Sequence, residues 1–407
     1  MASLVQPLDR SGTVTSPLGF TAGAVFAGMK TYGEGKLDLC ILASDRPCTV
    51  AATYTRNRLR SASIDVNQAH LSDGRAQAAV VNAAIANSST GDRGIADGER
   101  MTALAAAKLG LETANVLLGS TGVIGHFLPM DKIEDGISRI QLSRDGGEDF
   151  ARAIMTTDTR PKFASIRVGQ ATGVSYTLGG CCKGSGMIHP NMATMLAFLT
   201  TDAPVEQRFL QTALGAAVDR SWNLVSIDGD TSPSDTVLLM ANGAGGGDLI
   251  DANSPMAEEF AAALDELCVF LAKEVARDGE GATKVMEITV RGADSTADAR
   301  QLVREMTTSY LLKSAVHGAD PNWGRVVAVI GRSTVSIHEP GVTVAICGHE
   351  VFRDREPTDH DPEAVATAMQ GDTVTIEIEL GSGEGEATGW GCDLSAEYVS
   401  INADYHT

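Results

Sequence analysis

Apolar and polar residues alternate in several stretches of the second half of the chain. Between residues 374 and 380 every even position is Val, Ile or Leu, and every odd position is Thr or Glu. Residues 286–291 repeat the pattern, and residues 341–347 have the same character. Because successive side chains of a strand point to opposite faces, these stretches predict half-buried β-strands.

Other segments have the spacing of amphipathic helices. Between Pro255 and Gly279 the apolar residues recur every three or four positions, and they are Phe260, Leu264, Leu267, Leu271 and Val275. The proline suits a helix start and the glycine a helix stop, so one helix is predicted here. A second helix is predicted after residues 202–204. A third is expected over about residues 97–109, with Gly110 as its stop.

Composition places these elements in a mixed fold. The 407 residues include 43 glycines and only 5% aromatic residues, and short strand-like segments recur between turns, as in sheets covered by helices. No internal repeat or long linker divides the chain. We therefore expect an α/β (α+β) fold in which the two halves form one unit.

The charge and cysteine patterns exclude several classes of protein. The net charge of −20 argues against nucleic acid or an anionic membrane as partner. No signal peptide and no membrane-spanning stretch is recognised. Seven scattered cysteines suit reduced thiols in the cytoplasm, and no histidine has metal-ligand spacing, so neither a metal nor a cofactor is expected.

Glycine-rich runs suggest nucleotide binding, but none fits its template. The run at 179–185 lacks the Gly-Lys-Ser/Thr order of a phosphate loop, and the runs at 243–248 and 381–386 place an acid where a third glycine is needed. We interpret all three as turns between strands. Residues 228–230 resemble the start of a calcium loop, but Pro233 and Leu239 occupy its glycine and glutamate positions.

The segment from Lys183 to Leu196 carries the chemistry that we consider most informative. It contains Gly184, Gly186 and Pro190, which favour a tight turn, and it ends in Ala193 and Thr194 before an apolar run. A threonine hydroxyl there can attack the preceding peptide bond. Cleavage would make Thr194 a new N-terminus whose own α-amine serves as base. The alternative is an ordinary threonine at the start of a buried strand.

Residues 183–203, KGSGMIHPNMATMLAFLTTDA, resemble the signature of the ornithine acetyltransferase family, also called glutamate N-acetyltransferase. The similarity recurs in order along nearly the whole chain, at residues 120–125, 156–159, 228–232, 278–284, 318–325 and 398–407. The chain departs from the family's usual pattern at residues 82–87, where Asn-Ser-Gly-Asn-Ala-Asn is common, and at Pro233-Ser234, where Thr-Asn is usual. The first departure puts local packing and acceptor preference in question.

The resemblance implies a role for particular residues. Thr194 would be the nucleophile, released by cleavage after Ala193, and Thr121 and Gly122 would form the oxyanion hole. The implied substrate-binding residues are Thr157, Lys183, Thr194, Glu280, Asn402 and Thr407. Lys183 suits a substrate carboxylate and Glu280 an ammonium group.

The resemblance also implies a reaction and an assembly. Acetyl would move from N-acetylornithine to glutamate through an acetyl-threonine ester, and acetyl-CoA is a possible second donor. The fold would be a layered α/β sandwich of the ornithine acetyltransferase/aminopeptidase type, cleaved into intertwined fragments 1–193 and 194–407. Two copies of each fragment would form a heterotetramer. The alternatives are a related amidase or aminopeptidase and an uncleaved ligand-binding protein.

Overall fold

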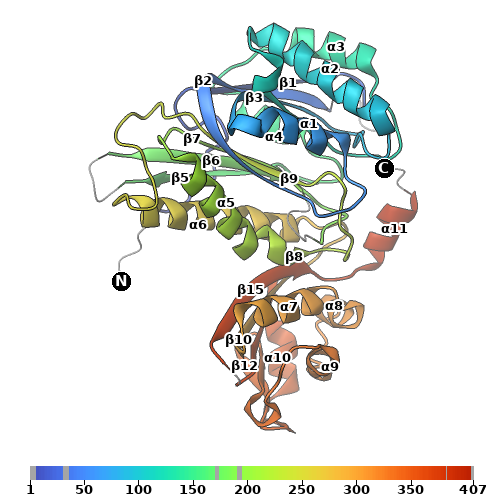
Figure 1. Cartoon of the computed structure of the whole chain (residues 1–407). Helices are drawn as coiled ribbons and strands as arrows, with labels where there is room; N and C mark the ends of the chain where they lie inside the picture. Colours follow the sequence, from blue (N-terminus) through green and yellow to red (C-terminus); the bar gives the residue numbers. More distant parts are fainter. Residues whose placement is uncertain (1–5, 31–35, 170–173, 190–194, 382, 405–407) are drawn as a thin grey trace.

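The computed structural model describes residues 6–30, 36–169, 174–189, 195–381 and 383–404. They form two β-sheets with helices packed on them (Figure 1). The first sheet contains β1 Phe20–Val25, β2 Leu39–Tyr54, β3 Arg75–Asn82, β4 Val116–Ser120, β5 Lys162–Val168, β6 Tyr176–Lys183, β7 Leu196–Thr201 and β9 Thr236–Ala241. The second contains β8 Val225–Ser226, β10 Val285–Ala293, β11 Thr343–Ile346, β12 His349–Arg353, β13 Glu356–Pro357, β14 Thr373–Glu379 and β15 Gly385–Cys392. The predicted mixed, layered α/β fold is confirmed.

The order of strands in the first sheet interleaves distant parts of the sequence. It runs β4-β3-β2-β9-β7-β6-β5, with β1 paired to β2. Strands β7 and β9 come after residue 194, yet they lie between β2 and β6, which come before it. The sheet therefore needs both halves of the chain.

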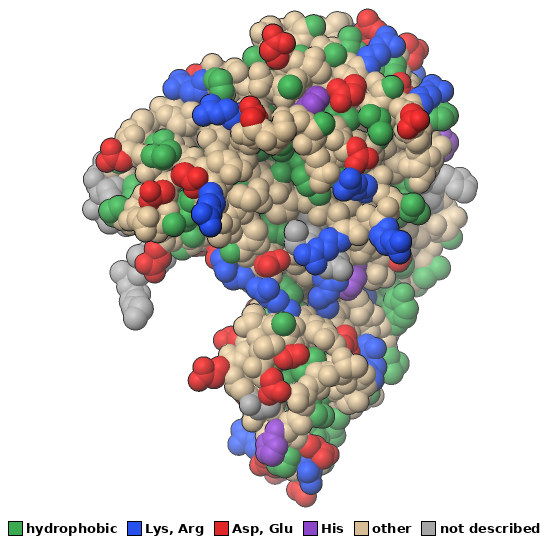
Figure 2. Space-filling view, viewed as in Figure 1, with side chains coloured by type: hydrophobic (Ala, Val, Ile, Leu, Met, Phe, Trp, Pro, Cys, Tyr) green, Lys and Arg blue, Asp and Glu red, His purple; other side chains and the backbone are tan. Residues whose placement is uncertain are grey.

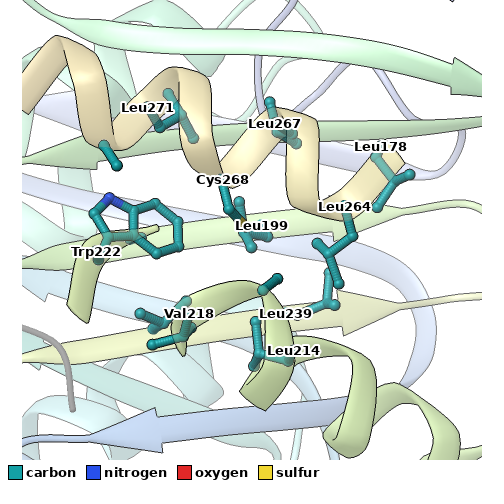
Figure 3. Close-up of a cluster of buried hydrophobic side chains, with 14 of the residues drawn as sticks. Leu178, Leu199, Leu214, Val218, Trp222, Leu239, Leu264, Leu267, Cys268 and Leu271 are labelled. Atoms are coloured by element: carbon teal, nitrogen blue, oxygen red, sulfur yellow. The ribbon is translucent and has the colours of Figure 1, made fainter. Parts of the chain in front are cut away.

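Two neighbouring helices, which run in the same direction, cover one face of this sheet. They are α5 Gln207–Arg220 and α6 Ala257–Arg277, and both were predicted from the sequence. Figure 3 shows Leu264, Leu267 and Leu271 of α6 pointing toward leucines of β6, β7 and β9, with Trp222 at one end. The apolar residues that predicted helix α6 are therefore buried against the sheet, where they stabilise the fold.

Four further helices pack against the part of the first sheet drawn at the top of Figure 1. They are α1 Ala62–His70, α2 Gly91–Leu109, α3 Met130–Arg139 and α4 Gly147–Ala153. The first three along the chain cover one face of β2, β3 and β4, and the fourth packs on the opposite face. Helix α2 ends as predicted, with Gly110 in a left-handed conformation at φ +69°. It begins six residues before the predicted start, because Gly94 and Gly98 lower helix propensity but allow close packing on Thr90 and Leu118.

The second sheet forms a smaller part of the molecule, below the first in Figure 1. Strands β10, β11 and β14 confirm the three strands predicted from alternation, and β10 and β14 pair in parallel. The remaining helices are α7 Thr296–Thr307, α8 Tyr310–His317, α9 Gly324–Arg332, α10 Pro362–Ala368 and α11 Ala396–Asp404. Lys and Arg side chains gather at the waist between the two parts, although the chain is acidic overall (Figure 2).

One glycine-rich run differs from its prediction. Gly179 and Gly180 lie inside β6 and not in a turn. A Cβ on Gly179 would stand 2.2 Å from the Thr13 carbonyl oxygen, and one on Gly180 would stand 2.6 Å from a Leu199 methyl group. The glycines therefore serve close packing against neighbouring segments. The run at 243–248 does form a turn, and the described part of 381–386 leads from β14 into β15.

All seven cysteines are free thiols, and all except Cys347 are buried. Within the described ranges, no helix has the length and apolar character needed to cross a membrane.

Candidate active site

The predicted site residues that the structure describes meet at one cavity of about 110 Å³. They come from five separate places in the sequence, and they are Thr121, Gly122, Thr157, Lys183, Glu280 and Asn402. Ala193, Thr194 and Thr407 lie outside the described residues. Met195 and Leu196, which follow Thr194 in the chain, line the same cavity.

Thr121 and Gly122 form the turn that follows β4. A Cβ on Gly122 would stand 2.1 Å from the carbonyl carbon of Ala84, and Gly122 has φ +124°, so only glycine fits without strain. The amides on either side are bonded to neighbouring carbonyls, Thr121 N–H to Asn82 at 3.1 Å and Val123 N–H to Ala84 at 2.9 Å. This turn is therefore fixed against residues 82–84.

Lys183, at the end of β6, reaches the same turn. Its Nζ lies 3.3 Å from Thr121 Oγ1, and the side chain is buried. An ammonium group can only donate, so the Thr121 hydroxyl accepts this hydrogen bond and keeps its own hydrogen for another acceptor. Burial lowers the pKa of the Lys183 ammonium against the opposing effect of the Asp158 carboxylate.

A buried ionic cluster lies behind Lys183. Lys162 Nζ contacts Asp158 Oδ1 at 2.7 Å and Asp278 Oδ2 at 2.5 Å. Asp158 Oδ1 also accepts the Gly184 N–H at 2.7 Å. Burial alone would raise the pKa of Asp158, but the ammonium groups of Lys162 and Lys183 outweigh it and hold that pKa well below its ordinary range. The cluster therefore joins the ends of three segments that line the cavity.

Glu280 and Asn402 form another wall of the cavity. Asn402 Nδ2, on α11, donates to Glu280 Oε2 at 2.7 Å. A Cβ on Gly186 would stand 2.4 Å from the Glu280 carboxyl carbon, so this glycine leaves the space that Glu280 occupies. Glu280 N–H donates to the Ser185 carbonyl at 2.9 Å, which ties the wall to the segment that follows Lys183.

Residues 228–230, which resemble a calcium loop in sequence, have a different role. Asp228 accepts the N–H groups of Met187 at 2.6 Å and Ile188 at 2.9 Å, and it thereby holds the backbone that lines the cavity. Among the described residues, no group of three or more His, Cys, Asp and Glu side chains is arranged to hold a metal ion.

The departures from the family pattern lie beside the site. Ala86 and Pro233 line the cavity, whereas Ala84 and Ile85 support it from behind. Ile85 forms bridges with Thr121 and Val123. The residues that differ from the family pattern at 82–87 therefore change mainly the packing behind the expected oxyanion hole.

Sequence reasoning missed Asp158, Lys162 and Asp235. Asp158 stands inside the 156–159 motif that carries the resemblance, and Lys162 follows it by four residues, so this half of the ion cluster had a sequence signal. Asp235 lines the cavity and is fully buried, but nothing in the sequence distinguishes it from an acid in a solvated turn.

Comparison with known proteins shows the family of this chain. A family model described as the ArgJ family matches residues 21–407. The chain belongs to the ArgJ family. The arginine biosynthesis bifunctional protein ArgJ of Dehalococcoides mccartyi is 44% identical over 97% of this chain and 98% of its own length. The ArgJ protein of Symbiobacterium thermophilum is 45% identical over 98% and 99%.

A solved structure leads to the same family. The crystal structure of ArgJ from Bacillus halodurans aligns with 38% identity and a TM-score of 0.50, over 51% of this chain and 98% of the solved chain. As a member of the ArgJ family, this protein is an acetyltransferase of arginine biosynthesis. The predicted family is confirmed.

Proposed function

We propose that this protein transfers the acetyl group of N-acetylornithine to glutamate through an acetyl ester on Thr194. The observation that carries the proposal is the meeting of Thr121, Gly122 and Lys183 with the Glu280 and Asn402 pair at one cavity. Cations and acids of this kind suit a zwitterionic amino acid. Met195, which is bonded to Thr194, lines the cavity and supports placing the nucleophile there.

In the first half-reaction, the Thr194 hydroxyl attacks the acetyl carbonyl and gives its proton to the Thr194 α-amine. An α-amine has a pKa of about 7.7 to 8.0, so a useful fraction is neutral near pH 7. The Thr121 hydroxyl and the Gly122 N–H donate to the developing oxyanion. The proton then passes to the ornithine nitrogen, the C–N bond breaks, and ornithine leaves.

In the second half-reaction, the neutral amine of glutamate attacks the acetyl ester. Its proton passes to Thr194 Oγ as the C–O bond breaks, and N-acetylglutamate leaves. Lys183 and Thr157 would bind the amino acid in both steps, together with Glu280, Asn402 and Thr407. Because donor and acceptor occupy one pocket in turn, the kinetics should be ping-pong.

Self-cleavage between Ala193 and Thr194 would create the nucleophile, giving fragments 1–193 and 194–407. The solved Bacillus halodurans chain supports a divided chain, since nearly all of it matches only about half of this sequence. We further propose a heterotetramer of two copies of each fragment, located in the cytoplasm. Acetyl-CoA is a candidate second donor.

The test is an assay of N-acetylglutamate formation from N-acetylornithine and glutamate. Thr194→Ala should remove both cleavage on a denaturing gel and transfer, because no hydroxyl remains. Thr194→Ser is the matched control and should keep both at a reduced rate. Acetate release that does not depend on glutamate would favour an amidase instead. A single full-length band with full transfer in Thr194→Ala would disprove the assigned nucleophile.

A further inference from the structure

Asp235 is an unexplained acid in the cavity wall. It directly precedes β9, lines the cavity and is only 2% exposed. Among the residues that the structure describes, Asp235 Oδ2 has no hydrogen-bond partner. A buried acceptor without a partner destabilises the fold, so its presence in a cavity points to a ligand that donates to it.

The strand register places Asp235 beside the expected site of reaction. Thr236 N–H donates to the Met195 carbonyl at 2.9 Å, so Asp235 lies next to the residue bonded to Thr194. Leu196 pairs with Thr236 on one side and with Lys183 on the other. Lys183 in turn donates to Thr121, the expected oxyanion donor.

The group bound there must therefore be a donor near the acetyl carbonyl. In both half-reactions that group is the nitrogen bound to acetyl or about to attack it. It carries N–H as an amide, an amine or an ammonium group, whereas the acetyl oxygen is an acceptor and belongs to the oxyanion hole.

The surroundings of the carboxyl fit this task. Burial raises the pKa of Asp235 well above its ordinary range, and the Ser232 hydroxyl and the Lys183 ammonium oppose that rise only in part. Burial therefore favours the neutral carboxyl even with Lys183 nearby, and an arriving ammonium group would add to the effect of Lys183 and stabilise the carboxylate.

We propose that Asp235 is a further substrate-binding residue of this enzyme, whose free carboxyl oxygen accepts a hydrogen bond from the reacting nitrogen of the amino acid. The inference rests on the proposed function, because it takes ornithine and glutamate as ligands. Asp235 and Glu280 differ in position and in partners. Glu280 belongs to another wall of the cavity, where it accepts a hydrogen bond from Asn402.

The test compares two ligands by calorimetry: ornithine and 5-aminopentanoate, which is ornithine without its α-amino group. Wild-type protein should bind ornithine at least about tenfold more tightly, as expected for a hydrogen bond to a charged group. In Asp235→Asn the preference should fall to within about twofold, since the amide offers one oxygen and a competing donor. Ser234→Ala, in the same loop, is the control and should keep the preference even if both ligands bind more weakly.

A preference retained in Asp235→Asn, or absent from the wild-type protein, overturns the role of Asp235. Wild-type protein that binds neither ligand and transfers no acetyl group contradicts the proposed function itself. If Asp235→Asn does not fold, Asp235→Ser replaces it. If the variant folds but is not cleaved, its preference is compared with that of Thr194→Ala, which is uncleaved and keeps Asp235.

Discussion

At the scale of single residues, Ala84 has a backbone conformation that suits glycine. Its φ is +88°, and its carbonyl carbon is the atom that approaches Gly122 most closely. The usual family pattern for residues 82–87, given above, has glycine at this position. A non-glycine residue in this region costs about 1–3 kcal/mol, and glycine costs about 0.5–1 kcal/mol more backbone entropy than alanine. Ala84→Gly should therefore raise the free energy of unfolding by about 1 kcal/mol.

The measurement is urea denaturation of the wild-type protein and of Ala84→Gly under the same conditions. Ala83→Gly provides the matched control, because residue 83 is the direct neighbour of Ala84 and has no positive φ. This variant should lower the free energy of unfolding by about 0.5–1 kcal/mol. If Ala84→Gly destabilises the protein as much as Ala83→Gly does, the left-handed conformation carries no strain.

A resemblance, and not local pattern, assigned most of the candidate site residues. Lys183 and Glu280 taken alone are charged residues of a kind usually found in solvent. Asp235 escaped prediction because its burial follows from the parallel pairing of β7 with β9. That long-range contact has no signature within a short window of sequence.

At the scale of elements, the Lys162 cluster holds the cavity walls together. It links β5 to the loop at 156–159 and to the end of α6, and Ser185 Oγ adds a hydrogen bond of 2.6 Å to the Asp278 carbonyl. Lys162→Met would leave two carboxylates buried without their cation. Breaking a buried pair in this way costs about 3–5 kcal/mol, so the free energy of unfolding should fall by that amount in urea denaturation.

The surface pair of Arg139 with Asp135 on α3 supplies the control. Both side chains are exposed, and Arg139→Gln should change stability by less than about 1 kcal/mol.

Unfolding at low pH provides a second measurement of the Lys162 cluster. Because the pKa of Asp158 is depressed in the fold, its contribution is present above the unfolded value of about 3.9 and is lost as pH falls through the folded value. Lys162→Met should unfold at higher pH, and equal acid midpoints would argue against the cluster.

The elements that the sequence predicted well are those with long, regular periodicity. Helix α6 and strands β10 and β14 have such patterns, and tertiary packing follows them. Helix α2 and strand β6 were misjudged in part because their glycines, which propensity assigns to turns, allow close contacts with other segments. Propensity is a local quantity, and these contacts are not.

At the scale of the whole molecule, the strand order of the first sheet determines whether the two fragments stay together after cleavage. The pattern of elements indicated one unit without a linker, but it did not give the strand order. In that order β9 pairs with β2 over six residue pairs, and β7 pairs with β6 over six more. Both of these pairings join one expected fragment to the other. The helices α5 and α6, from the second fragment, also cover strands of the first.

A break after Ala193 should therefore leave the molecule whole. We expect fragments 1–193 and 194–407 to elute together from a sizing column in native buffer, and to separate only in denaturant. Each fragment alone would expose the edges of missing strands and the apolar face of β6 or of α6, so isolated fragments should aggregate. Two bands on a denaturing gel from a single native peak would match this expectation. Fragments that separate in native buffer and stay soluble would contradict the interleaved sheet, because its central strands would then be dispensable.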